Sequence, residues 1–166
     1  MARAASGAQS GENRRRMGTM TILVKDGGFM PEDWQAGYVP LAALSNAPGQ
    51  AGVDLSTPQL GREEWARLCR LLPQIGLVRV KMRHFGDVAA LDLAQAIRRT
   101  GYRGRLRAHG AVLARIYTMA RRAGFDEIEL DPEQARLQPA EHWRNVPDWS
   151  PARRGGGAPR RDAPIR

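Results

Sequence analysis

Two short segments of the chain combine basic, imidazole and acidic side chains in a way that suits anion binding. Residues 83–87 read Arg-His-Phe-Gly-Asp, and residues 107–110 read Arg-Ala-His-Gly. Each segment follows a β-prone run and precedes a run with helical periodicity, so each is expected where a strand leads into a helix. Ligands of parallel sheets bind outside the carboxyl ends of the strands, near helix N-termini that attract anions. The candidate residues on this rim are Arg83, His84, Asp87, Arg107 and His109.

The rim predicts a site for a phosphate, sulfate, sulfite or carboxylate group, because guanidinium groups form strong paired hydrogen bonds with such anions. A plainer interpretation stays open. Asp87 can be an ordinary N-cap residue, and a loop histidine can be a simple surface residue. The alternation of Arg103, Arg105 and Arg107 can mark one solvent-facing side of an edge strand. The rim also requires that the two strands be neighbours in the sheet.

Other chemistries have less support in the sequence. The chain contains no GxxxxGK[ST] loop, no GxGxxG fingerprint, no GxSxG elbow and no HExxH helix, so we assign no catalytic residue and expect no cofactor. The single cysteine, Cys69, excludes an internal disulfide and a multi-cysteine metal site within one chain. It lies on the apolar stripe of an expected helix, which favours a buried structural thiol over a nucleophile. The spacing of the two rim histidines and Asp87 is not diagnostic of a metal site, and we predict none.

The second half of the chain has the regular pattern that must position this rim. Helical periodicity and turn signals predict alternating helices and strands. The expected helices cover residues 61–72, 88–100 and 110–123, and the expected strands cover residues 77–82, 103–108 and 126–130. Strands that alternate with helices at this spacing pair in parallel through right-handed crossovers. The fold class is therefore α/β, with a small parallel βαβαβ unit at residues 77–130.

The first half reads as an irregular, β-rich region. Residues 20–25 are expected to form a short strand that ends at a turn, Asp26-Gly27-Gly28. Residues 31–34 suit a turn or a single helical turn, residues 38–44 an edge strand or loop broken by Pro40, and residues 52–55 one more short strand. Beyond the parallel unit, residues 132–137 suit a helical turn. His142, Trp143 and Trp149 are possible anchors of the last segment on the domain.

Composition predicts a single α/β domain at residues 19–149 between basic, disordered tails at residues 1–18 and 150–166. The formal net charge is +9, and most of the excess lies in those tails. They lack the interleaved aromatic residues that stack on bases, so we do not expect nucleic-acid binding. No apolar run is long enough for a membrane helix, and the N-terminus lacks the apolar region of a secretory signal. The expected location is the cytoplasm.

Charge is also uneven inside the domain. Residues 79–122 contain eleven basic residues and two acids, whereas residues 126–148 contain seven acids and two arginines. Such segregation can steer an anion toward the basic part. It can equally reflect two solvated faces that neutralise each other across the fold, which is the interpretation we favour.

Several segments resemble a bacterial family of unknown function that is usually encoded beside assimilatory sulfite reductase and described as probably involved in sulfite reduction. The resemblance covers residues 20–131 and is most specific from Gly101 to Asp126. The matching residues are Glu32-Asp33-Trp34, Phe85, Asp87, Gly101-Tyr102-Arg103-Gly104, Leu106-Arg107-Ala108, Gly110, Val112-Leu113, Arg121-Arg122 and Gly124-Phe125-Asp126.

The chain also departs from the family pattern, mostly at polar positions near the expected rim. At seven positions the family usually has a polar or acidic residue, a cysteine or a glycine, whereas this chain has a nonpolar or basic residue. These positions are Val88, Ala89, Arg105, Ala111, Arg115, Ile116 and Ala123. The resemblance implies an accessory protein of inorganic sulfur assimilation that touches a small oxyanion and works beside sulfite reductase or another enzyme of that pathway. The alternative is a diverged paralogue that binds acidic partners. An oxidoreductase activity of its own is not supported by the residues, because redox chemistry needs a cofactor or reactive thiols.

Overall fold

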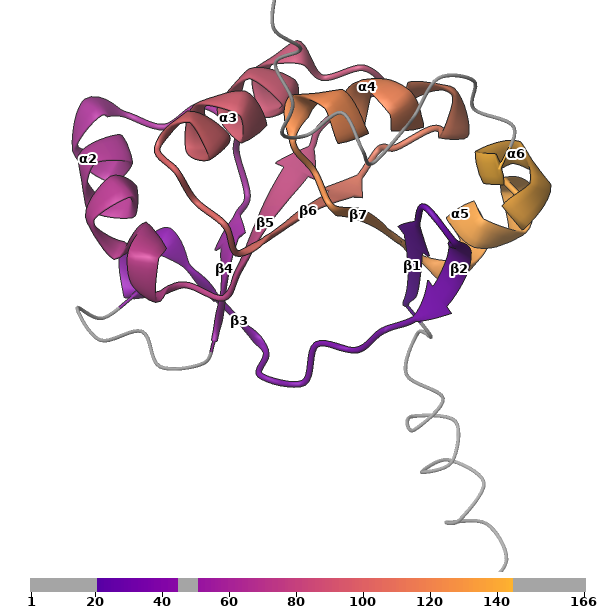
Figure 1. Ribbon diagram of the computed structural model, residues 1–166, viewed down its shortest axis with the longest axis horizontal. Coiled ribbons are helices and arrows are strands. Elements are labelled where there is room, and N and C mark those ends of the chain that lie inside the picture. The colour runs from indigo at the N-terminus through magenta and orange to yellow at the C-terminus, as the bar shows by residue number, and fades with distance from the viewer. Residues whose placement is uncertain (1–20, 45–50, 145–166) are drawn as a thin grey trace, which may run out of the picture.

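The computed structural model describes residues 21–44 and 51–144, which form a seven-stranded mixed sheet with three main helices on one face (Figure 1). The sheet contains β1 (Ile22–Lys25), β2 (Gly28–Pro31), β3 (Tyr38–Pro40), β4 (Gly52–Leu55), β5 (Leu77–Met82), β6 (Arg105–Gly110) and β7 (Glu127–Leu130). The helices are α2 (Arg62–Leu71), α3 (Val88–Arg99), α4 (Tyr117–Ala123), α5 (Pro132–Leu137) and α6 (Ala140–Arg144), with 3-10 turns at Leu41–Ala43, Leu72–Gln74 and Ala114–Ile116. The predicted basic tails and Trp149 lie outside the described residues. No helix within the described ranges is long and apolar enough to cross a membrane.

The strand order is β2-β1-β7-β6-β5-β4-β3. Strands β3 to β7 are parallel, while β1 pairs antiparallel with both β7 and β2. Helices α2, α3 and α4 connect successive parallel strands and lie side by side over the same face (Figure 1). The predicted parallel βαβαβ unit is therefore confirmed, and β5 and β6 are neighbours as the rim requires.

The two faces of the sheet have opposite character because side chains alternate along each strand. Val78, Val80 and Met82 of β5 point toward the helices and join the buried hydrophobic core, together with Leu106 and Ala108 of β6. On the other face the same strands carry the charged residues Arg79, Lys81, Arg105 and Arg107, followed by His109. We call this second face the charged face.

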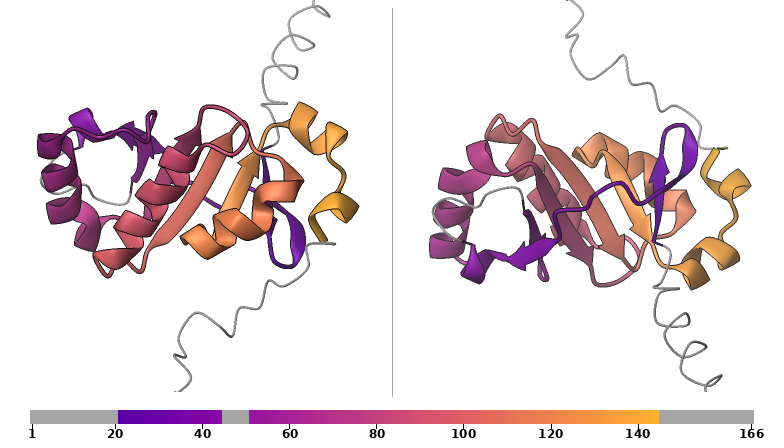
Figure 2. Two further views of the ribbon diagram at one scale, coloured as in Figure 1. Left: turned by 90° about the horizontal axis from the view of Figure 1, so that it is seen from above. Right: turned by 90° about the horizontal axis from the view of Figure 1, so that it is seen from below.

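A short segment, residues 32–37, runs across the charged face from β2 at one edge of the sheet to β3 at the opposite edge (Figure 2). We call it the strap. The single helical turn predicted for residues 31–34 does not form there. The acidic groups of the strap bind arginines of the sheet instead, as described below.

One strand was not predicted, and two further predictions differ from the structure. The strand β2 was not predicted, although the two-residue turn Asp26-Gly27 before it is a strong hairpin signal. Strand β6 lies in the centre of the sheet, so the interpretation of its arginines as one side of an edge strand is wrong. The helix expected from residue 110 begins only at Ala114 as a 3-10 turn and at Tyr117 as α4.

Gly110 explains the late start of that helix. Its φ of 92° lies in the left-handed region, and a Cβ there would stand 2.5 Å from the carbonyl oxygen of Met82 on the neighbouring strand. Strand β6 therefore continues through residue 110 and remains paired with Met82. The backbone N–H of Ala111 donates to the same carbonyl oxygen at 2.9 Å, which holds the turn against β5 before the chain can become helical.

Candidate functional site at the carboxyl ends of the parallel strands

Arg107 forms the centre of the charged face. Its side chain is fully buried, and its Nε donates to Glu127 at 2.7 Å. The two terminal nitrogens donate to both carboxylate oxygens of Glu32 and to the Tyr38 hydroxyl, and one of them also reaches Glu129 at 3.1 Å. Burial disfavours the charged form, but hydrogen bonds with Glu32 and the charge of Glu127 outweigh it and raise the pKa of Arg107 above its usual value.

The ion pairs spread outward from this centre across the strands. Arg105 binds both oxygens of Glu127 and also Asp33 of the strap. Arg79 connects Glu129 of β7 with Asp54 of β4, at 3.0 and 2.8 Å. Basic residues of β5 and β6 thus neutralise acidic residues of β7 and the strap. The segregated charges compensate each other, but on one largely buried face of the sheet and not on the two solvated faces that the sequence suggested.

The amino ends of the strands are covered on this face by Trp34 of the strap. A Cβ on Gly76, just before β5, would lie 3.2 Å from the indole ring, and one on Gly52 of β4 would lie 3.1 Å from its Nε1. The indole N–H donates to the carbonyl oxygen of Gly37 at 2.9 Å, which fixes the ring within the strap. A Cβ at either glycine would therefore require the indole ring to shift by a few tenths of an ångström, and at Gly52 it would also meet the Tyr38 ring at 2.9 Å.

The carboxyl ends of the strands are more open. Here Asp54 of β4, Lys81 of β5 and His109 of β6 lie together on the charged face, and we call them the carboxyl-end cluster. Lys81 is the register partner of His109 on the neighbouring strand. The Nε2 of His109 lies 3.4 Å from Oδ1 of Asp54, and their side chains are 17% and 25% exposed.

Asp54 is strongly held in its ionised form. Burial raises its pKa, but hydrogen bonding with His109 and Arg79 prevails and lowers the pKa to about 2. Lys81, by contrast, is exposed and makes no ion pair with any residue that the structure describes. The cluster therefore combines a fixed carboxylate, an imidazole and an unpaired ammonium group, which are the components of an anion site or of a proton-transfer site.

The loop after β5 holds the other predicted rim residues. The Arg83 guanidinium grips Asp87 with Nε and Nη2, at 2.9 and 3.1 Å, and its backbone N–H donates to the same carboxylate at 3.1 Å. This bidentate grip lowers the pKa of Asp87 to about 2, although burial opposes the shift. Asp87 stands at the N-cap position of α3, as expected, but its carboxylate accepts no hydrogen bond from the helix. Asp87 therefore restrains the loop after β5 by binding Arg83.

The structure brings together only part of the predicted rim. Arg83, His84 and Asp87 share one loop, and His109 lies at the end of the neighbouring strand. Arg107 belongs to the buried centre of the charged face, where carboxylates and Tyr38 already occupy its guanidinium. It can support the cluster from beneath, but it has no exposed surface to offer a ligand.

The sequence interpretation missed Asp54 and Lys81. Lys81 alternates with Arg79 along β5, so its place on the polar side of that strand follows from period-two spacing alone. Asp54 gave a weaker signal, because a single acid within the short run Gly-Val-Asp-Leu shows neither which strand it pairs with nor which face it occupies. Among the described residues, no group of three or more histidine, cysteine, aspartate or glutamate side chains could hold a metal ion.

A family of sequences described as "Bacterial protein of unknown function (DUF934)" matches residues 59–150, more than half of the chain. The chain belongs to this family. No curated protein and no solved structure matches it. The DUF934 match contains β5 to β7 with Lys81, Arg83 and His109, whereas Asp54 and the strap of this DUF934 protein lie before its first residue.

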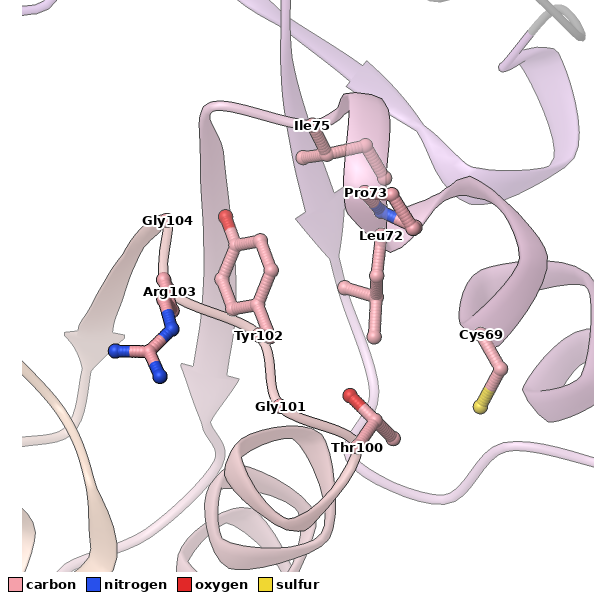
Figure 3. A pocket seen from close by; sticks show the side chains of 9 residues that line it. All are labelled: Cys69, Leu72, Pro73, Ile75, Thr100, Gly101, Tyr102, Arg103 and Gly104. Carbon is pink, nitrogen blue, oxygen red and sulfur yellow. The ribbon is translucent and has the colours of Figure 1, made fainter.

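A pocket of this DUF934 protein, with a volume of about 300 Å³, lies at the opposite, amino end of the strands (Figure 3). Cys69 lines it from one side and Tyr102 from the other, while the guanidinium of Arg103 points away from the thiol. Cys69 is half-buried, and burial raises the pKa of its thiol. A thiol that resists ionisation is a poor nucleophile, so this pocket offers less chemistry than the carboxyl-end cluster.

Proposed function

We propose that this protein binds a small oxyanion at the carboxyl-end cluster and acts as an accessory protein of inorganic sulfur assimilation. The observation that carries the binding part is Lys81. Four other cations of the charged face, namely Lys25, Arg79, Arg105 and Arg107, are each paired with carboxylates. Lys81 stands beside His109 without such a partner among the described residues, so its charge is available to a ligand.

The loop after β5 would complete the site. Arg83 is 37% exposed even though it grips Asp87, and His84 beside it is exposed. Asp87 acts as the positioning residue for Arg83, and Arg107 acts beneath the site by holding Glu129, the partner of Arg79.

The sulfur part of the proposal is supported by the resemblance to a family usually encoded beside assimilatory sulfite reductase. Sulfite and sulfate are small tetrahedral or pyramidal oxyanions of the kind that a lysine, an arginine and imidazole groups bind. The partner in this proposal is sulfite reductase or another enzyme of the same pathway. Deletion of the gene should slow growth on sulfate or sulfite and leave growth on cysteine unchanged, and equal growth on all three would refute this part.

Thermal unfolding in the presence of sulfite, sulfate or phosphate tests the binding part. For a dissociation constant of about 1 mM, ligand at about 10 mM stabilises the folded state by roughly 1.4 kcal/mol, which corresponds to a few degrees in Tm. Lys81→Ala should remove most of this shift. Arg103→Ala is the matched control, because Arg103 is also exposed but lies at the amino end of β6. No shift with any of the three anions would refute oxyanion binding.

A second candidate function is docking to an acidic protein surface. Phe85 and Val88 are large apolar residues with exposed fractions of 58% and 62%. Phe85 lies in the loop that carries Arg83 and His84, and Val88 follows that loop. Exposed apolar residues beside basic ones are typical of protein interfaces. If this candidate is correct, Phe85→Ser should abolish binding to the partner enzyme while the anion-induced shift in Tm stays unchanged.

A further inference from the structure

The orientation of His109 decides which of its ring nitrogens can meet a ligand. Nε2 is buried and lies 3.4 Å from Oδ1 of Asp54, but it makes no well-formed hydrogen bond with Asp54 or with any other described group. Nδ1 makes no hydrogen bond within the described residues and is not among their buried unpartnered atoms. The imidazole therefore turns one nitrogen inward, toward a fixed carboxylate, and leaves the other accessible at the carboxyl end of β6.

This orientation makes the protonation state of His109 matter for an anion. A neutral imidazole carries one N–H, and a facing carboxylate favours the tautomer with that proton on Nε2. Nδ1 then presents a lone pair to the site and repels an anion. Only the imidazolium form keeps the contact with Asp54 and offers an N–H from Nδ1 at the same time.

The charges around His109 also make its protonation state matter for the binding of a dianion. The charged or titratable groups around His109 are Asp54 on β4, Arg79 and Lys81 on β5, Arg107 on its own strand, Glu127 and Glu129 on β7, and Glu32 and Tyr38 near the strap. Arg79 and Arg107 are ion-paired with these carboxylates, and Arg83 of the neighbouring loop is paired with Asp87, so Lys81 is the one cation of the site without a carboxylate partner among the described residues when His109 is neutral. Protonation of His109 provides a second positive charge, which matches the two negative charges of sulfate.

We propose that oxyanion binding at the carboxyl-end cluster is coupled to the uptake of one proton by His109. This inference rests on the proposed function, because it assumes that an oxyanion binds at the cluster. It specifies the ligand class as a dianion held by Lys81 and imidazolium. By linkage, affinity should fall about tenfold for each pH unit at pH values where His109 is neutral in the free protein.

Titration calorimetry with sulfate tests the coupling, because sulfate stays fully ionised between pH 5 and pH 8 and takes up no proton itself. The heat of binding, measured at several pH values in buffers of different ionisation enthalpy, should give a proton uptake that rises toward one per sulfate as the pH increases. His109→Gln should bind more weakly at acidic pH and show no proton uptake. His142→Gln, which alters a histidine of α6 outside the proposed site, should retain the uptake.

Chemical shifts of the His109 ring in the unmodified protein provide an independent measurement if His109→Gln fails to fold. Added sulfate should move the titration midpoint of this ring to higher pH and leave that of His142 unchanged. Sulfate that binds with equal affinity at acidic and alkaline pH, or proton uptake that persists in His109→Gln, would overturn the inference and leave the proposed function standing. No heat of binding at any pH would instead refute oxyanion binding itself.

Discussion

Replacement of Arg107 by methionine tests whether the charged face is held together by this one side chain. Methionine has a similar length and can stay buried, but it removes the positive charge and every hydrogen bond of the guanidinium. Breaking a buried ion pair from one side costs about 3–5 kcal/mol, because the remaining charge is left without compensation. The carboxylates that Arg107 binds differ in how many other cations they keep after the substitution. This difference sets the expected loss of unfolding free energy.

Glu127 keeps Arg105 at 2.7 Å and Lys25 at 3.3 Å, and Glu129 keeps Arg79 at 3.0 Å. Glu32, by contrast, has no other ion pair among the described residues and loses its only cation. The expected loss of unfolding free energy is therefore at the lower end of that range, about 3 kcal/mol. For a domain of this size the loss corresponds to a decrease in Tm of roughly 10–12 °C.

Urea unfolding followed by circular dichroism measures this loss directly. Arg122→Met is the matched control, because Arg122 is exposed on α4, and it should cost less than about 0.5 kcal/mol. Glu32→Gln should cost clearly less in the Arg107→Met background than in the unmodified protein, because the pair is already broken there. If Arg107→Met lies within about 1 kcal/mol of the unmodified protein, the charged face is not organised by Arg107.

Two further predictions concern the loop after β5 and the turn after β6. The lowered pKa of Asp87, about 2, means that its ion pair with Arg83 contributes stability at pH values above about 4, where the unfolded carboxyl is also ionised. This contribution is lost as the pH falls toward 2. Urea midpoints over this range should therefore fall less steeply for Asp87→Asn, and parallel curves would contradict the assignment. Gly110→Ala should cost at least about 2 kcal/mol, because alanine disfavours a φ of 92° and its Cβ would meet the Met82 carbonyl. Gly27→Ala, which has nothing within 4 Å, should be nearly neutral in the same unfolding assay, and equal costs for the two variants would refute the strain argument.

The regular half of the fold was readable from the sequence because its signals are local. Strand β5 alternates apolar and basic residues from Val78 to Met82, and the predicted bounds agree with the observed ones. Gly101 and Gly124 end α3 and α4 with positive φ, as their places after each helix indicate. The predicted anchoring by Trp143 is also confirmed, since its buried ring packs edge-on against Tyr117 at 5.9 Å between centroids.

The charged face was not readable, because its contacts join residues that are distant in sequence. Glu32 lies 75 residues before Arg107, and no local pattern reports that pairing. The alternation of Arg105 and Arg107 showed correctly that both share one face of β6. Alternation cannot show what covers that face, so a fully buried arginine was interpreted as a solvent-facing one.

The charged face also explains why polar groups can be placed accurately at the carboxyl ends of the strands. A buried ion-pair network gives little net stability compared with an apolar core of similar volume. This network does, however, form a continuous chain of contacts from Arg107 through Glu129 and Arg79 to Asp54. Each contact restrains the next, so the carboxylate that faces His109 is positioned by groups buried beneath it. An apolar face would leave Asp54 without Arg79 as its partner, and the orientation of the imidazole toward a ligand would then be unrestrained.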